Sequence, residues 1–432
     1  MEIDFTDPNC SNEELVKAES TSKERANLEP KDSEDKLKNI LHQLKENREN
    51  QEQSNSEAIK SEPKEYIPFE FRATAKEYFK IWIVNIALTV VTLGIYSAWA
   101  KVRTNRYLYA STYLNGANFE YNANPKRILI GRLIVVGFYG VFYLFSDILG
   151  MYKVAVGIAL LFLLLLPWLI RQAIRFRLKS TSYRNIHFSY KGSVWGFYKL
   201  ALIAIFLFAI YATLSYIDLK YQKGSFSFVL SLLFSFVLIP ILYRGYKLLV
   251  LNNAYYGKAR FNFDATRLKV IGIFISIALI TFIFGLVFGA VVLFGSVIIK
   301  DIFVGATSGN LSQIATSVIV AAIFSLAVGF YKGLADGFLS NFTRDHTELG
   351  SGKFKGDIEP ISLGFISATN AVAVLLSVGL LFPWAKVRYL KYKFTHTLFA
   401  CNDYDKFVAN ELDNISTVGE EAMDFFDIDI GV

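Results

Sequence analysis

Charged side chains, cysteine and histidine are all scarce in this 432-residue chain. Only 19% of its residues are charged, whereas about a quarter of a soluble domain usually is. The two cysteines, Cys10 and Cys401, are too few for a disulfide framework or a metal pattern. The four histidines show no H-E-x-x-H or other ligand spacing, and neither a P-loop nor a nucleophile elbow is present. We therefore predict no enzyme activity, no catalytic residue, no metal and no cofactor.

The first 60 residues also lack an apolar h-region, so we expect no cleaved signal peptide and expect the first hydrophobic segment to act as the insertion signal.

The deficit of charge is concentrated in long apolar runs, and a helix needs roughly 20 residues to cross the hydrocarbon core. Six runs look like full spans: residues 128–147, 153–170, 195–217, 226–243, 269–299 and 312–331. Two further apolar segments, 79–99 and 361–385, flank them.

Charges of the two signs are unevenly placed along the chain. The net charge is −6 over residues 1–64, +21 over residues 65–401 and −8 over residues 402–432. We therefore predict a disordered acidic cytoplasmic tail (1–65), a membrane domain with internal repeats (66–401) and an acidic C-terminal tail (402–432). The tails are either simply solvated or fold back on the basic loops between them.

Four stretches of the membrane domain resemble one another, namely residues 95–121, 165–190, 238–263 and 380–407. In each, an apolar run gives way to a basic, aromatic-rich helical stretch and then to a short extended segment. Three of these segments carry an aromatic–x–aromatic pattern, Phe119/Tyr121, Phe188/Tyr190 and Phe261/Phe263, which is typical of a strand with one buried face. The sequence thus predicts an all-α polytopic membrane protein of six to eight membrane helices in pseudo-repeated units, with short surface β segments between them.

The connectors that carry the repeat hold most of the lysine and arginine of the six central spans, and the alternate connectors hold little. Positive charge in short loops marks the cytoplasmic face, so we predict that the repeated connectors face the cytoplasm. If segments 79–99 and 361–385 each crossed once, the polar N-terminal tail and the cations after residue 385 would lie outside the cytoplasm, against this rule. We therefore expect both termini to be cytoplasmic.

The two flanking segments match each other closely. Both end in the letters W-A-K-V-R, and Asn85 and Asn370 each lie 14 residues before the tryptophan. We predict that both segments enter and leave on the cytoplasmic side as broken, re-entrant helices, with Gly94 and Gly379 as plausible break points. A single ordinary span stays open as the alternative, because about 21 residues is the length of one pass.

These two segments also carry a family resemblance. The stretches EYFKIWIVNIALTVVTLGIYSAWAKVRTNRYLY and SLGFISATNAVAVLLSVGLLFPWAKVR resemble the YjgN family of bacterial inner-membrane proteins. The resemblance covers about residues 66–410 and leaves out the acidic tails. It implies a multi-pass protein of the bacterial inner membrane but no activity, because the family is named as a domain of unknown function.

The basic aromatic stretches are the strongest functional lead, because polybasic segments gain about 1 kcal/mol per cation beside an anionic leaflet. Alternatively, these charges only fix the topology. We predict lipid head-group contacts at Lys101, Arg106, Arg171, Arg175, Arg244 and Lys386.

We predict a cavity at Asn85 and Asn370, with Arg103 and Arg388 at its cytoplasmic mouth. Lys332 and Asp336 lie one helical turn apart, where they can pair.

Two functions fit these features. The first is transport or permeation of a small or lipidic solute through a cavity between the repeats. The second is a non-transporting membrane scaffold that binds anionic lipids or partner proteins through its basic face. We expect no nucleic-acid partner, because the basic residues adjoin the membrane. Homo-oligomers and unidentified protein partners are compatible with both functions.

Overall fold

The structure, a computed structural model, describes residues 66–220, 224–304 and 310–401 together with Tyr404 and Val408. All of these residues belong to one compact unit, Pro63–Val432. The predicted N-terminal tail 1–65 lies outside the described residues, as does the predicted C-terminal tail 402–432 apart from Tyr404 and Val408.

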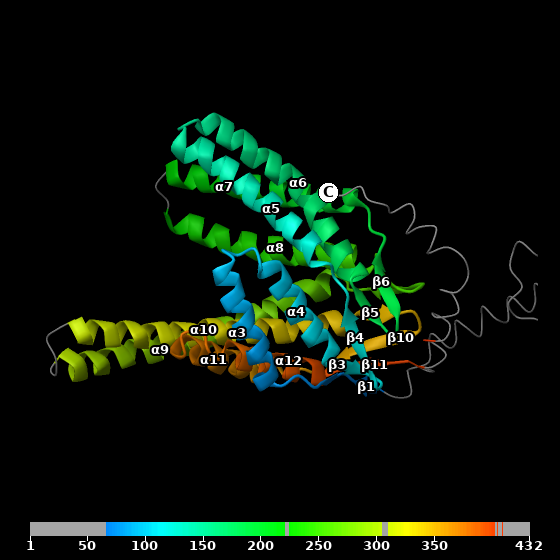
Figure 1. The fold of residues 1–432 in the computed structure, drawn as a ribbon. Coiled ribbons are helices and arrows are strands. Elements are labelled where there is room, and N and C mark those ends of the chain that lie inside the picture. Colours follow the sequence, from blue (N-terminus) through cyan, green and yellow to red (C-terminus); the bar gives the residue numbers. More distant parts are fainter. Residues whose placement is uncertain (1–65, 221–223, 305–309, 402–403, 405–407, 409–432) are drawn as a thin grey trace, which may run out of the picture. The chain divides into compact units, whose positions relative to one another are not determined.

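Ten α-helices occur in the described part of the chain, and they form five consecutive pairs (Figure 1). The first and last pairs are short, and they are α3 (Ala75–Val91) with α4 (Ser97–Ala110) and α11 (Pro360–Leu376) with α12 (Phe382–Thr395). The three central pairs are long, and they are α5 (Pro125–Tyr143) with α6 (Tyr152–Lys179), α7 (Val194–Lys220) with α8 (Gly224–Leu251), and α9 (Arg267–Val304) with α10 (Asn310–Asp345). A π-helical segment, Leu144–Ile148, extends α5 toward α6.

Eleven short strands alternate with these helix pairs, and hydrogen bonds join them into one antiparallel sheet. They are β1 (Tyr66–Pro68), β2 (Glu70–Phe71), β3 (Thr112–Leu114), β4 (Ala117–Tyr121), β5 (Thr181–Tyr183), β6 (Ile186–Tyr190), β7 (Ala254–Tyr256), β8 (Ala259–Phe263), β9 (Thr347–Leu349), β10 (Gly352–Gly356) and β11 (Thr397–Ala400). Their order in the sheet is β1-β11-β10-β9-β8-β7-β6-β5-β4-β3-β2.

The prediction of an all-α fold with six to eight membrane helices and separate surface β segments is therefore wrong. The described residues contain ten helices, and the β segments combine into a single eleven-stranded sheet. The physical reason lies in the strands themselves. A two-stranded hairpin leaves backbone N–H and C=O groups without partners along both edges, and neighbouring hairpins satisfy these groups by pairing edge to edge.

Residues 66–71 close this sheet almost completely. The segment supplies both end strands of the sheet order, because β1 pairs with β11 and β2 pairs with β3. Phe69 links the two strands, and its backbone N–H donates to the carbonyl oxygen of Thr397 at 2.9 Å. A single stretch of six residues thereby joins the last strand of the chain to the first hairpin.

Tight turns set the geometry of the hairpins. Asn115 (φ 44°) and Gly116 (φ 75°) join β3 to β4, and Arg184 (φ 46°) and Asn185 (φ 64°) join β5 to β6. Positive φ at both central residues is characteristic of the type I′ turn, whose twist matches that of the paired strands. The Asn-Gly letters of the first turn are the usual sequence signal for it.

Aromatic side chains pack together on one face of the nearly closed sheet. This aromatic core consists of Phe69, Leu114, Tyr183, Ile186, Tyr256, Ala259, Leu349, Phe399 and Val408, with other half-buried aromatic residues packed against it. The first aromatic residue of each predicted pattern, such as Phe188 or Phe261, packs in this core. The second, such as Tyr121 or Phe263, packs against residues of the helices. The alternating pattern thus ties the sheet to the helices above it.

Each helix pair leaves the sheet and returns to it. In the first pair α3 follows β2 and α4 leads into β3, so the segment 79–99 is not one helix. The chain reverses instead at Leu93 (φ 50°) and Gly94 (φ 92°). The last pair reverses in the same way at Val378 (φ 51°) and Gly379 (φ 90°). Both segments are helical hairpins that break at the predicted glycines, and neither forms a straight single span.

Five helices in the described residues are long and apolar enough to cross a membrane. They are Pro125–Ile148, Tyr152–Lys179, Val194–Ile217, Arg267–Ala290 and Val318–Asp345. Five of the six predicted spans overlap them, and the sixth, 226–243, falls within α8. Many of their large apolar side chains are exposed, as a surface in contact with hydrocarbon requires.

Small residues allow α10 and α11 to approach closely. Gly329, Gly333 and Gly337 follow one another at four-residue spacing on the side of α10 that faces α11. A Cβ atom added at Gly333 would lie 2.4 Å from the carbonyl oxygen of Leu363, closer than atoms can approach. Contacts of this kind hold helices together in membranes, where lipid is as apolar as the side chains.

We predict that Gly333→Ala destabilises the protein by about 1–3 kcal/mol, because the new methyl group forces α10 away from α11. The matched control is Gly272→Ala in α9, where a Cβ would meet nothing within 4 Å. The better helix propensity of alanine should make that variant neutral or up to about 1 kcal/mol more stable. Unfolding in detergent measures both, and equal effects of the two substitutions would contradict the packing described.

Candidate functional site

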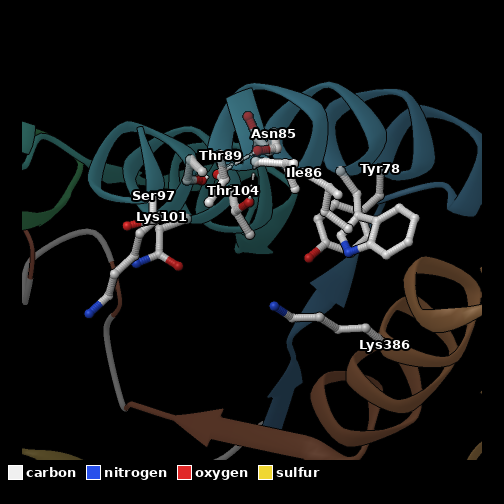
Figure 2. A pocket seen from close by; sticks show the side chains of 12 residues that line it. Tyr78, Asn85, Ile86, Thr89, Ser97, Lys101, Thr104 and Lys386 are labelled. Carbon is white, nitrogen blue, oxygen red and sulfur yellow. Dashed lines mark hydrogen bonds between the residues drawn. The ribbon is translucent and has the colours of Figure 1, made fainter. Parts of the chain in front are cut away.

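A pocket of about 410 Å³ lies between the first helical hairpin and α12. The α3 side contributes Tyr78, Trp82, Asn85, Ile86, Thr89 and Val90, and the α4 side contributes Ser97, Ala100, Lys101, Thr104 and Asn105. Figure 2 shows Lys386 reaching from α12 toward these two helices. The pocket therefore combines an apolar wall on α3 with two lysine amines, and none of the described residues that line it is acidic.

Asn85 braces the two helices that form the pocket. Its Nδ2 donates to the carbonyl oxygen of Ala100 at 3.4 Å and to Oγ1 of Thr104 at 3.3 Å. The residue is only 5% exposed, and its Oδ1 atom has no hydrogen-bond partner among the described residues. A buried acceptor left in this state costs about 1–3 kcal/mol. Oδ1 of Asn85 is therefore a buried acceptor that the described residues leave unused, on a residue that lines the pocket.

In the last hairpin, both the amide nitrogen and the carbonyl oxygen of the matching residue, Asn370, have hydrogen-bond partners. Nδ2 of Asn370 donates to the carbonyl oxygen of Ala385 at 3.0 Å, which repeats the brace seen at Asn85. Here, however, Oδ1 of Asn370 accepts a hydrogen bond of 3.1 Å from Nη1 of Arg388. Arg103 holds the same place in the first W-A-K-V-R motif, but it is exposed on α4. The two hairpins thus share a brace and differ in whether an arginine fills the acceptor.

Lys386 extends from α12 toward the pocket (Figure 2). Its amine lies 5.5 Å from the ring centre of Tyr78 and 5.9 Å from that of Phe382. Burial lowers the pKa of the Lys386 amine below its ordinary value, because the charged form loses solvation. An anion beside this amine would replace part of that lost solvation. The other pocket cation, Lys101, is exposed at the edge.

The remaining predicted cations do not gather at this pocket. Nε of Arg171 donates to the carbonyl oxygen of Gly192 at 3.1 Å, and Nε of Arg244 donates to that of Ala265 at 2.9 Å. Both arginines therefore tie the end of one helix to the start of the next pair. Arg103 and Arg106 are exposed on α4, and Arg175 is half-buried on α6.

A second polar cluster joins α8, α10 and α12. The carboxylate of Asp336 on α10 pairs with Lys393 at 2.6 Å and accepts a hydrogen bond from the hydroxyl of Tyr389, both on α12. Lys247 and Arg344 lie close enough to Asp336 to interact with it electrostatically. The predicted partner of Asp336, Lys332, is exposed on α10 instead. Sequence analysis singled out Asp336 but missed its partners, because only the fold brings α12 beside α10.

The fold and the site together define a polytopic membrane protein in which helical hairpins rise from a nearly closed β-sheet. A family model described as "Bacterial protein of unknown function (DUF898)" matches residues 66–425, and the chain belongs to this family. The resemblance to the YjgN family is thereby confirmed, because curated relatives carry that name. No solved structure matches the chain.

Two of these relatives are named "Inner membrane protein YjgN". The protein of Escherichia coli strain K12 is 33% identical over 174 residues, which are 40% of this chain and 43% of that protein. The protein of Salmonella typhimurium strain LT2 is 25% identical over 340 residues, which are 73% of this chain and 84% of that protein. The chain thus matches less than half the length of the first relative. The five membrane-capable helices among the described residues agree with an integral membrane protein.

We predict that Asp336 and Lys393 are coupled by about 1–3 kcal/mol, because their hydrogen-bonded ion pair is half-buried. A double-mutant cycle with Asp336→Asn and Lys393→Met measures this coupling from unfolding in detergent. The control cycle combines Asp336→Asn with Lys332→Met, and its coupling should be close to zero. A larger coupling in the control cycle would show that Asp336 pairs along α10, against the structure.

Proposed function

We propose that the protein binds an anionic membrane amphiphile at the pocket between α3, α4 and Lys386. In this proposal Lys101 and Lys386 neutralise an anionic oxygen of the head group. A hydrogen-bond donor on the same head group pairs with Oδ1 of Asn85 after a rotation of the side chain exposes this buried atom. Trp82 and Ile86 contact the apolar part of the molecule. The observation that carries the proposal is a pocket lined by Lys101, Lys386 and Asn85, in which the buried Oδ1 atom of Asn85 has no hydrogen-bond partner among the described residues.

The last hairpin indicates which chemical group the first one is missing. There the acceptor of the matching asparagine, Asn370, is satisfied by an N–H of Arg388. A ligand at Asn85 would have to supply the equivalent donor, for example a hydroxyl group. Two lysines that line the same pocket disfavour a cationic ligand and favour an anion. These requirements together suit a phosphate head group that bears a hydroxyl.

Supporting evidence for the orientation comes from the ends of the described chain. β1 and β11 pair, and Tyr66 lies opposite Ala400, so both acidic tails begin at the same sheet. All five helical hairpins also start and finish there, and the same order of elements recurs in each unit. We infer that the sheet and both termini face the cytoplasm, and that the recurring order reflects an internal repeat. The lysines of the pocket would then meet anionic lipids of the inner leaflet.

Movement of a solute across the membrane is a second candidate function. It is favoured by the cluster around Asp336, because ionisable groups within or beside membrane helices often mark solute or proton paths. In that case Asp336→Asn should abolish a flux measured in reconstituted vesicles while leaving lipid binding at the α3–α4 pocket unchanged. No flux in vesicles with the native chain would leave lipid binding as the function.

Three lipids separate the contributions of charge and hydrogen bonding to binding. Phosphatidylglycerol has a net negative charge and hydroxyl donors, phosphatidylmethanol has the charge without a donor, and phosphatidylcholine has neither. We predict that affinity falls in this order when each lipid is titrated against the full chain in detergent and measured by native mass spectrometry. From phosphatidylglycerol to phosphatidylmethanol the affinity should fall about three- to tenfold, for the loss of one hydrogen bond. From phosphatidylmethanol to phosphatidylcholine it should fall about fivefold for each lysine that contacts the charge.

Substitutions show which residues cause each of these two decreases in affinity. Asn85→Leu should remove the preference for phosphatidylglycerol over phosphatidylmethanol, and Lys386→Ala should weaken both anionic lipids about fivefold. Lys80→Ala is the matched control, because Lys80 is an exposed residue of α3 outside the pocket. The proposal fails if the native chain binds phosphatidylglycerol and phosphatidylmethanol equally, or if Lys80→Ala weakens binding as much as Lys386→Ala.

A further inference from the structure

The tips of the two short hairpins expose large apolar residues on a strained backbone. Leu93 is 94% exposed with φ at 50°, and Val378 is 92% exposed with φ at 51°. Residues with a side chain rarely adopt positive φ, and for a β-branched residue such as valine it is a true outlier. In water, the backbone strain would act against folding, and the exposed side chain would contribute almost nothing to offset it. Burial of these side chains in an apolar surrounding would compensate for both.

Other apolar residues extend each tip into a small patch. Val91 and Ile95 flank Leu93 in the first hairpin, and Leu376 and Leu380 flank Val378 in the second. All four are exposed. Each patch therefore exposes several hydrophobic side chains at the tip of its hairpin, where the chain reverses between the two helices.

The tryptophan of each unit indicates how far these tips extend. Trp99 precedes β3 by thirteen residues, Trp384 precedes β11 by thirteen, and Trp168 precedes β5 by thirteen. At 1.5 Å per residue, each lies about 20 Å along its helix from the sheet. In α6 the apolar span continues beyond Trp168, so this tryptophan marks the membrane interface. In α4 and α12 only two helical residues continue beyond the tryptophan, a rise of about 3 Å, and the turn of the hairpin tip follows them.

We infer that the tips of α3–α4 and α11–α12 insert shallowly into the membrane leaflet that faces the sheet, with Leu93 and Val378 among the upper acyl chains. A helical rise of about 3 Å together with the turn agrees with the shallow insertion of interfacial helices, which is about 5–10 Å. Lys101 and Lys386 follow each tip by roughly one turn, where lipid phosphates lie. The two hairpins are interfacial anchors and do not span the membrane. This inference holds whether or not the α3–α4 pocket binds a head group.

Depth-dependent fluorescence quenching tests this inference on the full chain. Cys10 and Cys401 are replaced by serine, a single cysteine is introduced at Leu93 or Val378, and an NBD fluorophore is attached in reconstituted vesicles. The vesicles contain phospholipids with a nitroxide at carbon 5 or carbon 12 of the acyl chain. Reference labels are placed at Ile205, in the middle of a membrane-capable helix, and at Asn115, in the turn of a β-hairpin.

We expect the carbon 5 nitroxide to quench both tip labels at least twofold more than the carbon 12 nitroxide does. The label at Ile205 should show the reverse order, and the label at Asn115 should respond mainly to iodide in the buffer. Iodide quenching of the tips at the level of Asn115 would overturn the inference. A tip profile equal to that of Ile205 would overturn it as well. Self-quenching that disappears on dilution with unlabelled protein would reveal a second copy as the occupant, which also contradicts it.

A second variant separates tip insertion from folding. Leu93→Asn removes the apolar side chain but retains a residue that tolerates positive φ, so the turn should keep its shape. With the label at Ile95, this change should lower quenching by the carbon 5 nitroxide at least twofold without lowering the unfolding temperature. Leu149→Asn, an exposed apolar residue between α5 and α6, is the control and should leave the Ile95 label unchanged. Unchanged quenching in Leu93→Asn would overturn the inference.

Discussion

The pairing of residues 66–71 with two distant strands is the constraint on which the rest of the structure depends. By joining β11 on one side and β3 on the other, this segment brings the first and last helical hairpins together. Trp82 of α3 consequently stacks with Phe382 of α12, with ring centres 6.3 Å apart. Without this closure Lys386 would have no route to the pocket formed by α3 and α4, more than 280 residues earlier in the chain.

The sequence motif N…W-A-K-V-R forms the same local structure twice with two different outcomes. In both hairpins the asparagine amide braces the helices, and a glycine with positive φ allows the reversal. Arg388 then folds back onto its own asparagine, whereas Arg103 stays exposed. In one copy the acceptor of the asparagine is therefore satisfied by the protein itself. In the other it has no partner among the described residues, and the asparagine lines a pocket with two lysines.

Local signals predicted local structure well. The two glycines marked the breaks in the flanking segments, and the apolar runs marked the membrane-capable helices, because both depend on residues close in sequence. The nearly closed sheet could not be predicted, because four similar β-hairpins give no indication of which of their edges pair. The same limit hid the partners of Asp336, since a carboxylate on α10 and a lysine on α12 meet only after the sheet closes.

Cross-linking across the closure tests the central claim most directly. Cysteines replace Trp82 and Phe382 in a chain that otherwise lacks cysteine, and a short bifunctional maleimide is added to membranes that contain the protein. The closed sheet predicts efficient cross-linking within one chain, because the native rings lie 6.3 Å apart. Failure to cross-link, while both cysteines react with a monofunctional maleimide, would contradict the closure and with it the pocket.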